Sequence, residues 1–306
     1  MRDYPPRDVT IHRVPGAYVV GEGLAFDRTG AVIGPTITQH SPAEVDAAAA
    51  ALHAALAAGP IPQAPGETLL CTKRGAGNYG HWLYEMLPIA ALGLPELQSG
   101  AWRALLPAAQ GPLALAIQDS LTLLGVPSTQ QVLSSDAPQR FESLLVAAGL
   151  TAHGGYISPL VTDCLAALAQ GVPADGSGRL WVSRAGDHRS LWNEAELAAV
   201  LAAAGWTICR PGTMPLARQI ALFRGARHIA GVSGAGLTNI AFAAPGARVT
   251  VFAPAAMPDT FFWLLSELCG HDYTEIRCRH ADRQGGLNPW DSALVLSLPD
   301  ALACLL

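Results

Sequence analysis

A histidine and a glutamate stand four residues apart in the segment 78–88, which reads Asn-Tyr-Gly-His-Trp-Leu-Tyr-Glu-Met-Leu-Pro. If this segment is helical, His81, Tyr84 and Glu85 share one face close to the helix N-terminus. A carboxylate can orient an imidazole ring and make it a better base, so the pair suits proton transfer. The same spacing would also suit a metal ion, although no third ligand is evident nearby, or a hydrogen-bonded structural histidine.

A second segment, 231–239, reads Gly-Val-Ser-Gly-Ala-Gly-Leu-Thr-Asn and lies between an apolar run and a helical pattern. Small residues there allow backbone N–H groups to approach an anion, and the helix dipole favours negative charge. Phosphate is the natural ligand of such a turn, although glycines between a strand and a helix also serve close packing. The residues that we expect to bind the anion are Ser233, Gly234, Ala235, Gly236, Thr238 and Asn239.

Two other interpretations of this segment stay open. Its spacing is similar to a dinucleotide-binding fingerprint, but it is not G-x-G-x-x-G, and no acidic residue lies in the strand expected at 248–252. Its order also resembles the nucleophile elbow of hydrolases around Ser233, with Ala235 in place of the final glycine. In that case His271 or His280 would complete a catalytic triad.

Arg184 and Arg189 lie close together in a chain that has few charged residues. Arg184 would leave the carboxyl end of a strand, and Arg189 would lie in the loop that follows. Because arginine binds phosphate oxygens through two parallel hydrogen bonds, this pair indicates an anion site. Alternatively, the arginines are solvated and pair with Asp187 or Glu194, while Asn193 caps the next helix.

The elements that must position these residues begin with a pattern typical of β-structure. Residues 1–40 predict a small antiparallel region, with strands at 17–26 and 31–38 joined by a turn. Ser41 and Glu44 then form a capping box, which predicts a helix that ends at a Gly-Pro pair.

From residue 68 onward, short apolar runs alternate with helical patterns. In the N-terminal half the expected strands are 68–73, 103–107, 130–133 and 144–148, and the expected helices are 81–92 and 112–124. In the C-terminal half the expected strands are 179–183, 206–209, 228–231, 248–252 and 273–278, and the expected helices are 193–204, 215–225, 235–242 and 259–268. This alternation predicts an α/β fold with doubly wound parallel sheets.

The most linker-like stretch of the chain, 171–178, separates the two halves. We therefore expect an N-terminal domain, 1–170, made of the β region and an α/β part at 41–170, and a C-terminal domain, 179–306. Ligands of such domains usually lie at the carboxyl ends of the parallel strands, in a cleft.

The composition limits the possible functions. The chain has 306 residues, of which 50% are hydrophobic and 14% charged, and its formal net charge is −5. So large an apolar fraction excludes intrinsic disorder, and the acidic balance argues against nucleic acid as a partner. The low charge fits an alanine-rich chain, or a protein that works beside a membrane.

Signals for export or membrane insertion are not evident in the sequence. The N-terminus has prolines and charges of both signs in place of an apolar run, and no apolar stretch approaches the roughly 18 residues of a membrane span. The six cysteines never form C-x-x-C, as is typical of reduced thiols. We therefore expect a cytoplasmic protein, at most peripheral to the inner face of the membrane.

Three segments, in this order, resemble glycosyltransferase family 61, which includes bacterial capsular-polysaccharide transferases. The matching residues of the first segment are Asn78, Gly80, His81, Trp82, Leu83, Leu87 and Pro88. Those of the second are Ser183, Arg184, Arg189, Asn193, Glu194 and Leu197. Those of the third are Gln219, Ile220, Leu222, Phe223, the stretch 234–239, Pro245 and Gly246.

This resemblance implies a GT-B fold, in which two Rossmann-like domains face a cleft and the C-terminal one holds a nucleotide-sugar donor. It implies transfer with inversion to a polysaccharide or glycolipid acceptor, without a cofactor and without a divalent metal, because the arginines and the 234 turn neutralise the diphosphate. It implies a base for the acceptor hydroxyl, either His81 or Glu85. The residues that we expect to support this site are Asn78, Tyr84, Asn193 and Glu194.

The chain departs from the usual pattern of this family at two positions. Ser233 stands where a histidine is common, and Val251 stands where a carboxylate suited to holding a ribose is common. Two other functions therefore stay open: a hydrolase that uses Ser233, and a non-catalytic module that binds sugars or nucleotides. The sequence does not predict the transferred sugar, the acceptor or the oligomeric state.

Overall fold

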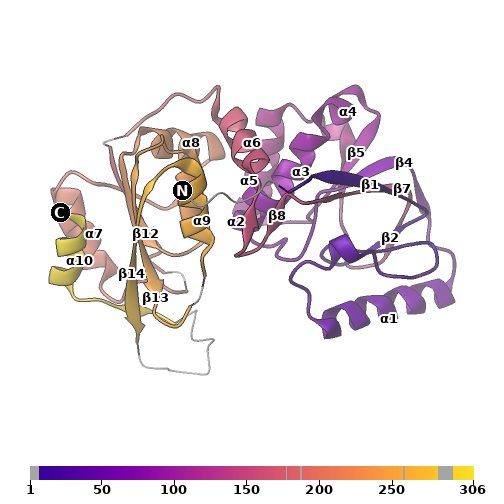
Figure 1. Ribbon diagram of the computed structural model, residues 1–306, viewed down its shortest axis with the longest axis horizontal. Coiled ribbons are helices and arrows are strands. Elements are labelled where there is room, and N and C mark those ends of the chain that lie inside the picture. The colour runs from indigo at the N-terminus through magenta and orange to yellow at the C-terminus, as the bar shows by residue number, and fades with distance from the viewer. Residues whose placement is uncertain (1–6, 177, 187, 258, 282–291) are drawn as a thin grey trace. The chain divides into compact units, whose positions relative to one another are not determined.

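The computed structural model divides the chain into two compact units, unit 1 (Met1–Cys164) and unit 2 (Leu165–Leu306), each with its own β-sheet (Figure 1). The residues that the structure describes are 7–176, 178–186, 188–257, 259–281 and 292–306. Among them, no helix combines the length and the apolar character needed to cross a bilayer.

Unit 1 contains a seven-stranded mixed sheet with the order β3-β2-β7-β4-β5-β6, and β1 pairs with a further part of β7. Strands β7, β4, β5 and β6 are parallel, whereas β1 and β2 run antiparallel to β7, and β3 runs antiparallel to β2. A separate hairpin follows. The strands are β1 (Thr10–Pro15), β2 (Tyr18–Val20), β3 (Leu24–Phe26), β4 (Gln63–Leu70), β5 (Trp102–Leu106), β6 (Gln131–Leu133), β7 (Gln139–Ala148), β8 (Thr151–Ala152) and β9 (Tyr156–Ile157).

The antiparallel strands near the N-terminus do not form a region of their own, because they extend the same sheet as the parallel strands. The strand expected at 31–38 is wrong. Only one β-bridge, Phe26 to Val32, forms there, and a 3-10 turn, η1 (Gly34–Thr36), follows. Pro35 has no N–H to give to a ladder, which explains why the apolar run does not continue as a strand.

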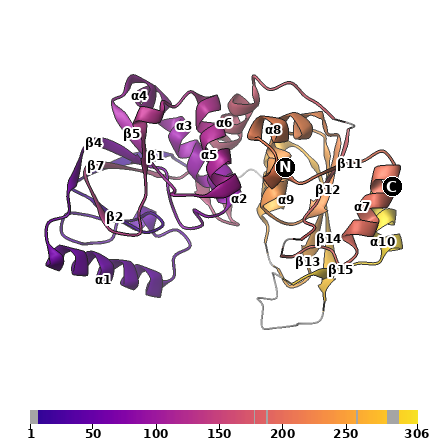
Figure 2. The ribbon, with the colours of Figure 1, turned by 180° about the vertical axis from the view of Figure 1, so that it is seen from behind.

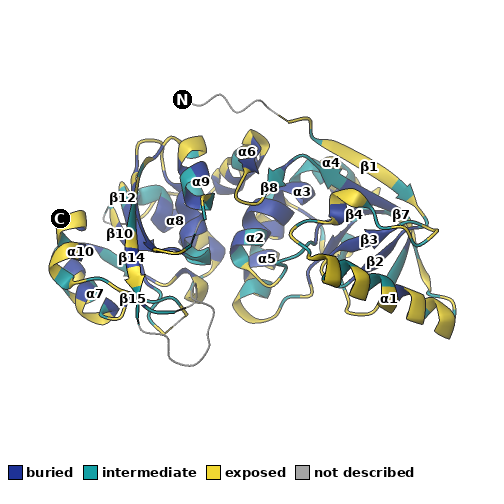
Figure 3. Cartoon of the chain, turned by 60° about the horizontal axis from the view of Figure 1, so that its bottom comes forward, coloured by how far each residue is buried: buried dark blue, intermediate teal, exposed yellow. Residues whose placement is uncertain are grey.

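The helices of unit 1 surround this sheet. Besides η1, they are α1 (Pro42–Ala58), α2 (Tyr79–His81), the π-helix η2 (Trp82–Met86), α3 (Leu87–Leu92), α4 (Leu94–Ser99), α5 (Gly111–Leu124), the 3-10 turn η3 (Ser128–Gln130) and α6 (Pro159–Ala169). The division between the units falls within α6. The capping box predicted at Ser41 and Glu44 is confirmed at the start of α1. This alanine-rich helix is largely exposed and buries only Leu52 (Figure 3).

Unit 2 contains a six-stranded sheet with the order β11-β10-β12-β13-β14-β15, in which only β15 is antiparallel. The parallel sheet predicted for this half is therefore confirmed. Its strands are β10 (Arg179–Val182), β11 (Thr207–Cys209), β12 (His228–Val232), β13 (Arg248–Pro254), β14 (Asp272–His280) and β15 (Leu294–Val295).

Helices cover both faces of this sheet, with α7 and α10 side by side on one face and α8 and α9 on the other (Figures 1 and 2). A core cluster joins the first pair of helices to the strands through Trp181, Leu197, Phe252 and Ala301. The helices of unit 2 are α7 (Glu194–Ala203), the 3-10 turn η4 (Pro211–Thr213), α8 (Leu216–Gly225), the 3-10 helix η5 (Ala235–Phe242), α9 (Phe261–Cys269) and α10 (Leu298–Leu305).

Candidate functional site

His81 and Glu85 lie where the helix of residues 79–92 widens from α to π geometry and returns to α. Pro88 explains the wide turn. In a regular α-helix its ring would collide with the carbonyl of Tyr84, and it has no N–H to give to that carbonyl. Short π segments within α-helices are frequent at functional sites.

Local contacts hold the start of this helix in place. Asn78 is the N-cap, and its Oδ1 accepts a hydrogen bond from the N–H of Gly80 at 2.7 Å. Gly75, with φ of +85°, lies against the ring of His81, where a Cβ would come within 2.8 Å of two ring carbons. Tyr84 is fully buried. Asn78 therefore caps this helix and Tyr84 packs in the core, while their supporting role in a site stays a prediction.

Glu85 is the centre of a polar cluster, and only 4% of it is exposed. Its Oε2 accepts hydrogen bonds from Lys73 Nζ at 2.8 Å and His81 Nδ1 at 3.0 Å, and its Oε1 accepts one from His153 Nδ1 at 3.3 Å. The rings of His81 and His153 stack with their centroids 5.1 Å apart. The predicted contact between His81 and Glu85 is confirmed, whereas Lys73 and His153 are not among the predicted residues.

The environment of Glu85 distinguishes the two candidate bases. Burial alone would raise the pKa of Glu85, but hydrogen bonds from His153 and His81 and the charge of Lys73 hold that pKa well below its ordinary value. Glu85 is therefore an ionised, weakly basic carboxylate at neutral pH. Because the carboxylate of Glu85 can only accept, the proton of the His81 ring lies on Nδ1. Nε2 of that ring has no hydrogen-bond partner among the described residues. Glu85 is thus placed to orient the ring of His81, and Nε2 of that ring is the candidate base.

The same cluster offers three groups that could ligate a cation, since ligand atoms of His81, Glu85 and His153 lie within 4.8 Å of one another. Two features oppose this use. The ammonium of Lys73 already lies on Oε2 of Glu85, and both Nδ1 atoms face the carboxylate to which they donate protons. A metal ion would have to displace the ammonium of Lys73 and the Nδ1 protons of His81 and His153, so these three groups fit a metal ion poorly.

In unit 2 the arginines and the glycine turn meet at the ends of neighbouring parallel strands. Arg184 follows β10 and Gly234 follows β12, which pairs with β10. The guanidinium of Arg184 packs directly on the backbone of Gly234, in the space that a Cβ would occupy. Arg189, whose φ is +61°, donates from Nη1 to the carbonyl of Ser233 at 3.2 Å. The structure thus brings together residues that lie about 45 positions apart.

Arg184 is held by its own loop and by α7. Its Nη2 donates to the carbonyl of His188 at 2.7 Å, and its backbone N–H donates to Oε1 of Glu194, also at 2.7 Å. Glu194 is buried, so its supporting role is to fix the chain after β10. Asn193 occupies the N-cap position of α7, but its side chain makes no capping bond. Asp187, the alternative partner of the arginines, lies outside the described residues.

The segment after Gly234 forms a 3-10 helix, η5, in place of the expected α-helix. Thr238 and Asn239 are buried, and their side chains are used inside the fold. Thr238 Oγ1 donates to the carbonyl of Ala235, and Asn239 Nδ2 donates to Gln219 Oε1 at 2.9 Å and to the carbonyl of Gly236 at 3.1 Å. These two side chains hold η5 in place, so the group of this segment that could bind an anion is the backbone at its N-terminus.

The hydrolase alternative finds no support in this geometry. Ser233 is buried, and its Oγ has no hydrogen-bond partner among the described residues, so no histidine stands beside it as a base. His271 Nε2 instead bonds to the carbonyl of Ile240 at 2.9 Å, and neither ring nitrogen of His280 has a described partner. Val251 is buried in β13 and is uncharged, so it cannot hold a ribose in the way that a carboxylate at this position would.

The chain is similar in sequence to one known protein family. The family model for glycosyltransferase 61 matches residues 79–250, a range that includes His81, Glu85, both arginines and η5. No curated protein matches the chain in sequence. Among solved structures, the bacterial iron-containing dodecameric glycosyltransferase TibC from enterotoxigenic E. coli is similar, with 15% identity and a TM-score of 0.33. That similarity covers 78% of this chain and 70% of that one.

Proposed function

The chain belongs to glycosyltransferase family 61, and on this premise we propose that it transfers a sugar, with inversion, from a nucleoside diphosphate to a hydroxyl of a saccharide or glycolipid. The observation that carries the proposal is the pairing of two unlike sites. One is an oriented imidazole at His81, and the other is a pair of arginines packed on the glycine turn of η5.

The donor diphosphate binds, in this proposal, at the carboxyl ends of β10 and β12. The strand order of unit 2 reverses between these two strands, and ligands of doubly wound sheets bind outside such a point. Arg184 and Arg189 supply positive charge, and the first N–H groups of η5 have no partner within the helix. Because these groups neutralise the leaving diphosphate, the proposed reaction uses no divalent metal and no cofactor.

The acceptor is activated by His81. Its Nε2 takes the proton of the acceptor hydroxyl while that oxygen attacks the anomeric carbon of the donor. The bond between this carbon and the diphosphate oxygen breaks, and the diphosphate leaves with the electron pair. Glu85 stays ionised and stabilises the imidazolium that forms, which is the role that its low pKa favours. One displacement of this kind inverts the anomeric configuration.

A single displacement requires the acceptor oxygen and the anomeric carbon to meet, so we propose that the two units form a GT-B arrangement. Parallel strands with ligand-binding groups at their carboxyl ends in each unit support this proposal. We also propose that the enzyme works in the cytoplasm and is at most peripheral to the membrane. All six cysteines are free, which suits a reducing compartment.

Calorimetric titration with a panel of nucleoside diphosphates and nucleotide sugars, with and without Mg²⁺, tests the proposal. We expect at least one nucleotide to bind with an affinity that Mg²⁺ does not change, and its sugar form to be turned over with inversion. If no nucleotide binds in either condition, the proposed function is wrong. Binding without transfer or hydrolysis would instead identify a non-catalytic module.

A further inference from the structure

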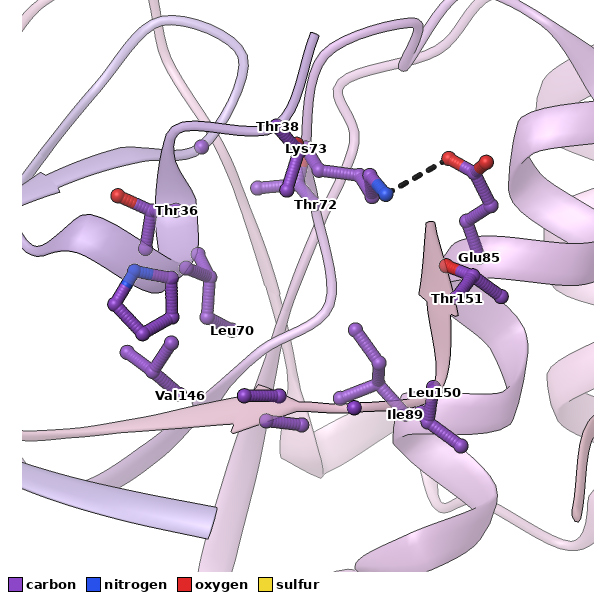
Figure 4. Close-up of a pocket in the computed structure, with 15 residues that line it drawn as sticks. Thr36, Thr38, Leu70, Thr72, Lys73, Glu85, Ile89, Val146, Leu150 and Thr151 are labelled. Atoms are coloured by element: carbon purple, nitrogen blue, oxygen red, sulfur yellow. Dashed lines mark ion pairs between the residues drawn. The ribbon is translucent and has the colours of Figure 1, made fainter. Parts of the chain in front are cut away.

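A cavity of about 270 Å³ lies in unit 1 beside the ion pair of Lys73 and Glu85 (Figure 4). It is formed by the last residues of β4 and β7 together with the residues that follow them, within 70–73 and 146–151, and by the turn around η1. Strands β4 and β7 are parallel neighbours, and the strand order of unit 1 reverses between them. The cavity therefore occupies the place where α/β sheets bind ligands.

Two hydroxyl groups in the cavity wall have no hydrogen-bond partner within the part of the chain that the structure describes. Thr72 is 1% exposed, and its Oγ1 makes no hydrogen bond among the described residues. Thr38 is only partly buried, but its Oγ1 atom is inaccessible to solvent and also makes no hydrogen bond among the described residues. Buried polar groups in folded proteins are almost always hydrogen-bonded, and a hydroxyl left unpaired is costly. The two threonines therefore indicate a ligand that supplies the missing hydrogen bonds.

The other residues that line the cavity indicate the chemistry of that ligand. One part of the cavity is polar, with Thr72 and Thr151, and another is apolar, with Leu70, Ile89 and Val146 (Figure 4). Its charged groups, Lys73 and Glu85, pair with each other at 2.8 Å. A ligand that needs hydrogen bonds, presents an apolar face and brings no charge is a neutral sugar ring. The volume lies just below the usual range of roughly 300–1,000 Å³ for ligand pockets, which limits the occupant to a single ring.

We propose that this cavity binds one neutral sugar ring of the acceptor, with its hydroxyls on Thr38 and Thr72 and its C–H face on the apolar wall. That this ring belongs to the acceptor rests on the proposed function, whereas the binding of a neutral sugar rests on the cavity alone. Glu85 borders the cavity and also holds His81, so the bound ring lies next to the side chain that orients the base. Among the described residues that line the cavity, the cation is Lys73, which pairs with Glu85, so we expect the cavity to exclude acidic sugars.

Titration with methyl glycosides of neutral hexoses and with glucuronate, followed by NMR, tests this inference on the full chain. We expect a neutral glycoside to bind and glucuronate not to bind. Thr72→Val and Thr38→Val should each weaken binding by roughly 2- to 12-fold, the effect of one neutral hydrogen bond. The thermal midpoint should not fall, because each variant removes a hydroxyl that is unpaired in the free protein.

Thr68→Val is the matched control. Thr68 is also fully buried with an unpartnered Oγ1, and it lies on β4, but it does not line the cavity. This variant should leave glycoside binding unchanged. The inference is overturned if no neutral glycoside binds, if glucuronate binds as well as they do, or if Thr72→Val has no larger effect than the control.

A nucleoside diphosphate titrated into the same samples separates the two proposals. If nucleotide binds and no glycoside does, the cavity assignment fails and the proposed function stands. If a glycoside binds in a manner that depends on Thr72 while no nucleotide binds, the cavity assignment stands and the proposed function fails.

Discussion

The two units place opposite chemistry at the same topological position. In unit 1, the strand order reverses between β4 and β7, and the nearby group is a buried carboxylate surrounded by Lys73, His81 and His153. In unit 2, it reverses between β10 and β12, and the nearby groups are two arginines and a glycine turn. The first set can hold and move a proton, and the second can bind an anion.

The difference lies in which atoms partner the charged side chains. The charge of Glu85 is balanced by neighbouring side chains, and in the proposed mechanism this carboxylate orients His81. The bonds of Arg184 and Arg189 include donations to the backbone carbonyls of His188 and Ser233, which carry no net charge. A fold of this type sets where a ligand binds, while a few side chains set what it is.

The largest expected effect is on the base. His81→Ala should lower turnover by about 10²- to 10⁴-fold, because it removes the group that accepts the hydroxyl proton, while the KM for the donor stays unchanged. Steady-state kinetics with the nucleotide sugar identified by titration would measure both. His153→Ala is the control: it keeps Nε2 of His81, so turnover should fall by less than about tenfold. An increase in donor KM as large as the loss of turnover would contradict this assignment.

A smaller effect is expected on the anion site. Arg184→Ala should raise the donor KM by about 10- to 150-fold, or 1.5–3 kcal/mol, the effect of hydrogen bonds to a charged group. Arg184→Lys should recover only part of this loss, because lysine lacks the planar fork. Arg248→Ala, at the amino end of β13, is the control and should leave the donor KM unchanged. Equal effects of the Arg184 and Arg248 variants would remove Arg184 from the site.

The units should also differ in their response to acid. Burial, together with the charges of Arg248 and Arg179, lowers the pKa of His228 in unit 2 to about 4 from 6.5. The unfolded chain then binds the extra proton first, so stability is complete above pH 6.5 and is lost as the pH falls toward 4. The loss is at most about 3 kcal/mol, and less where solvent screens the ring.

Glu85 affects the stability of unit 1 in a different pH range. Its pKa is depressed from 4.5, so its contribution to unit 1 is present above that value and is lost only below it. Hydrogen exchange between pH 6.5 and 4.5 should therefore show unit 2 losing protection before unit 1, and His228→Gln should reduce this loss. Equal loss in both units, or a loss that His228→Gln does not change, would contradict the difference.

The smallest effect is expected from metal removal. Treatment with a chelator should leave the rate of transfer unchanged, because Lys73 holds the carboxylate oxygen that a cation would need. A loss of activity that a divalent cation restores would show that His81, Glu85 and His153 serve as ligands. Unit 1 would then contain a metal site in place of the proposed proton-transfer site.

What could be predicted from the sequence depended on distance along the chain. The contact of His81 with Glu85 and the capping box of α1 are confirmed, because both join residues within one turn of a helix. Lys73 and His153 could not be found in this way. They reach Glu85 from the end of one strand and from the turn of a later hairpin, and periodicity does not indicate which loops meet.

The same limit applies to the fold. The parallel strands of unit 2 follow from the βαβ rhythm, whereas the joining of β1 to β7 pairs the N-terminus with residues 143–148 and has no local signal. The helix at 235–242 was expected from its apolar pattern, which does not distinguish 3-10 from α geometry. The cavity could not be predicted either, because the unpaired hydroxyls of Thr38 and Thr72 are evident only once their surroundings are known.

The most direct test of the central difference is calorimetric titration of one nucleoside diphosphate into three proteins: the unmodified chain, His81→Ala and Arg184→Ala. We predict the unmodified affinity for His81→Ala and a loss of about 10- to 150-fold for Arg184→Ala. A similar loss in both variants, or no loss in either, would contradict the division between a proton site in unit 1 and an anion site in unit 2.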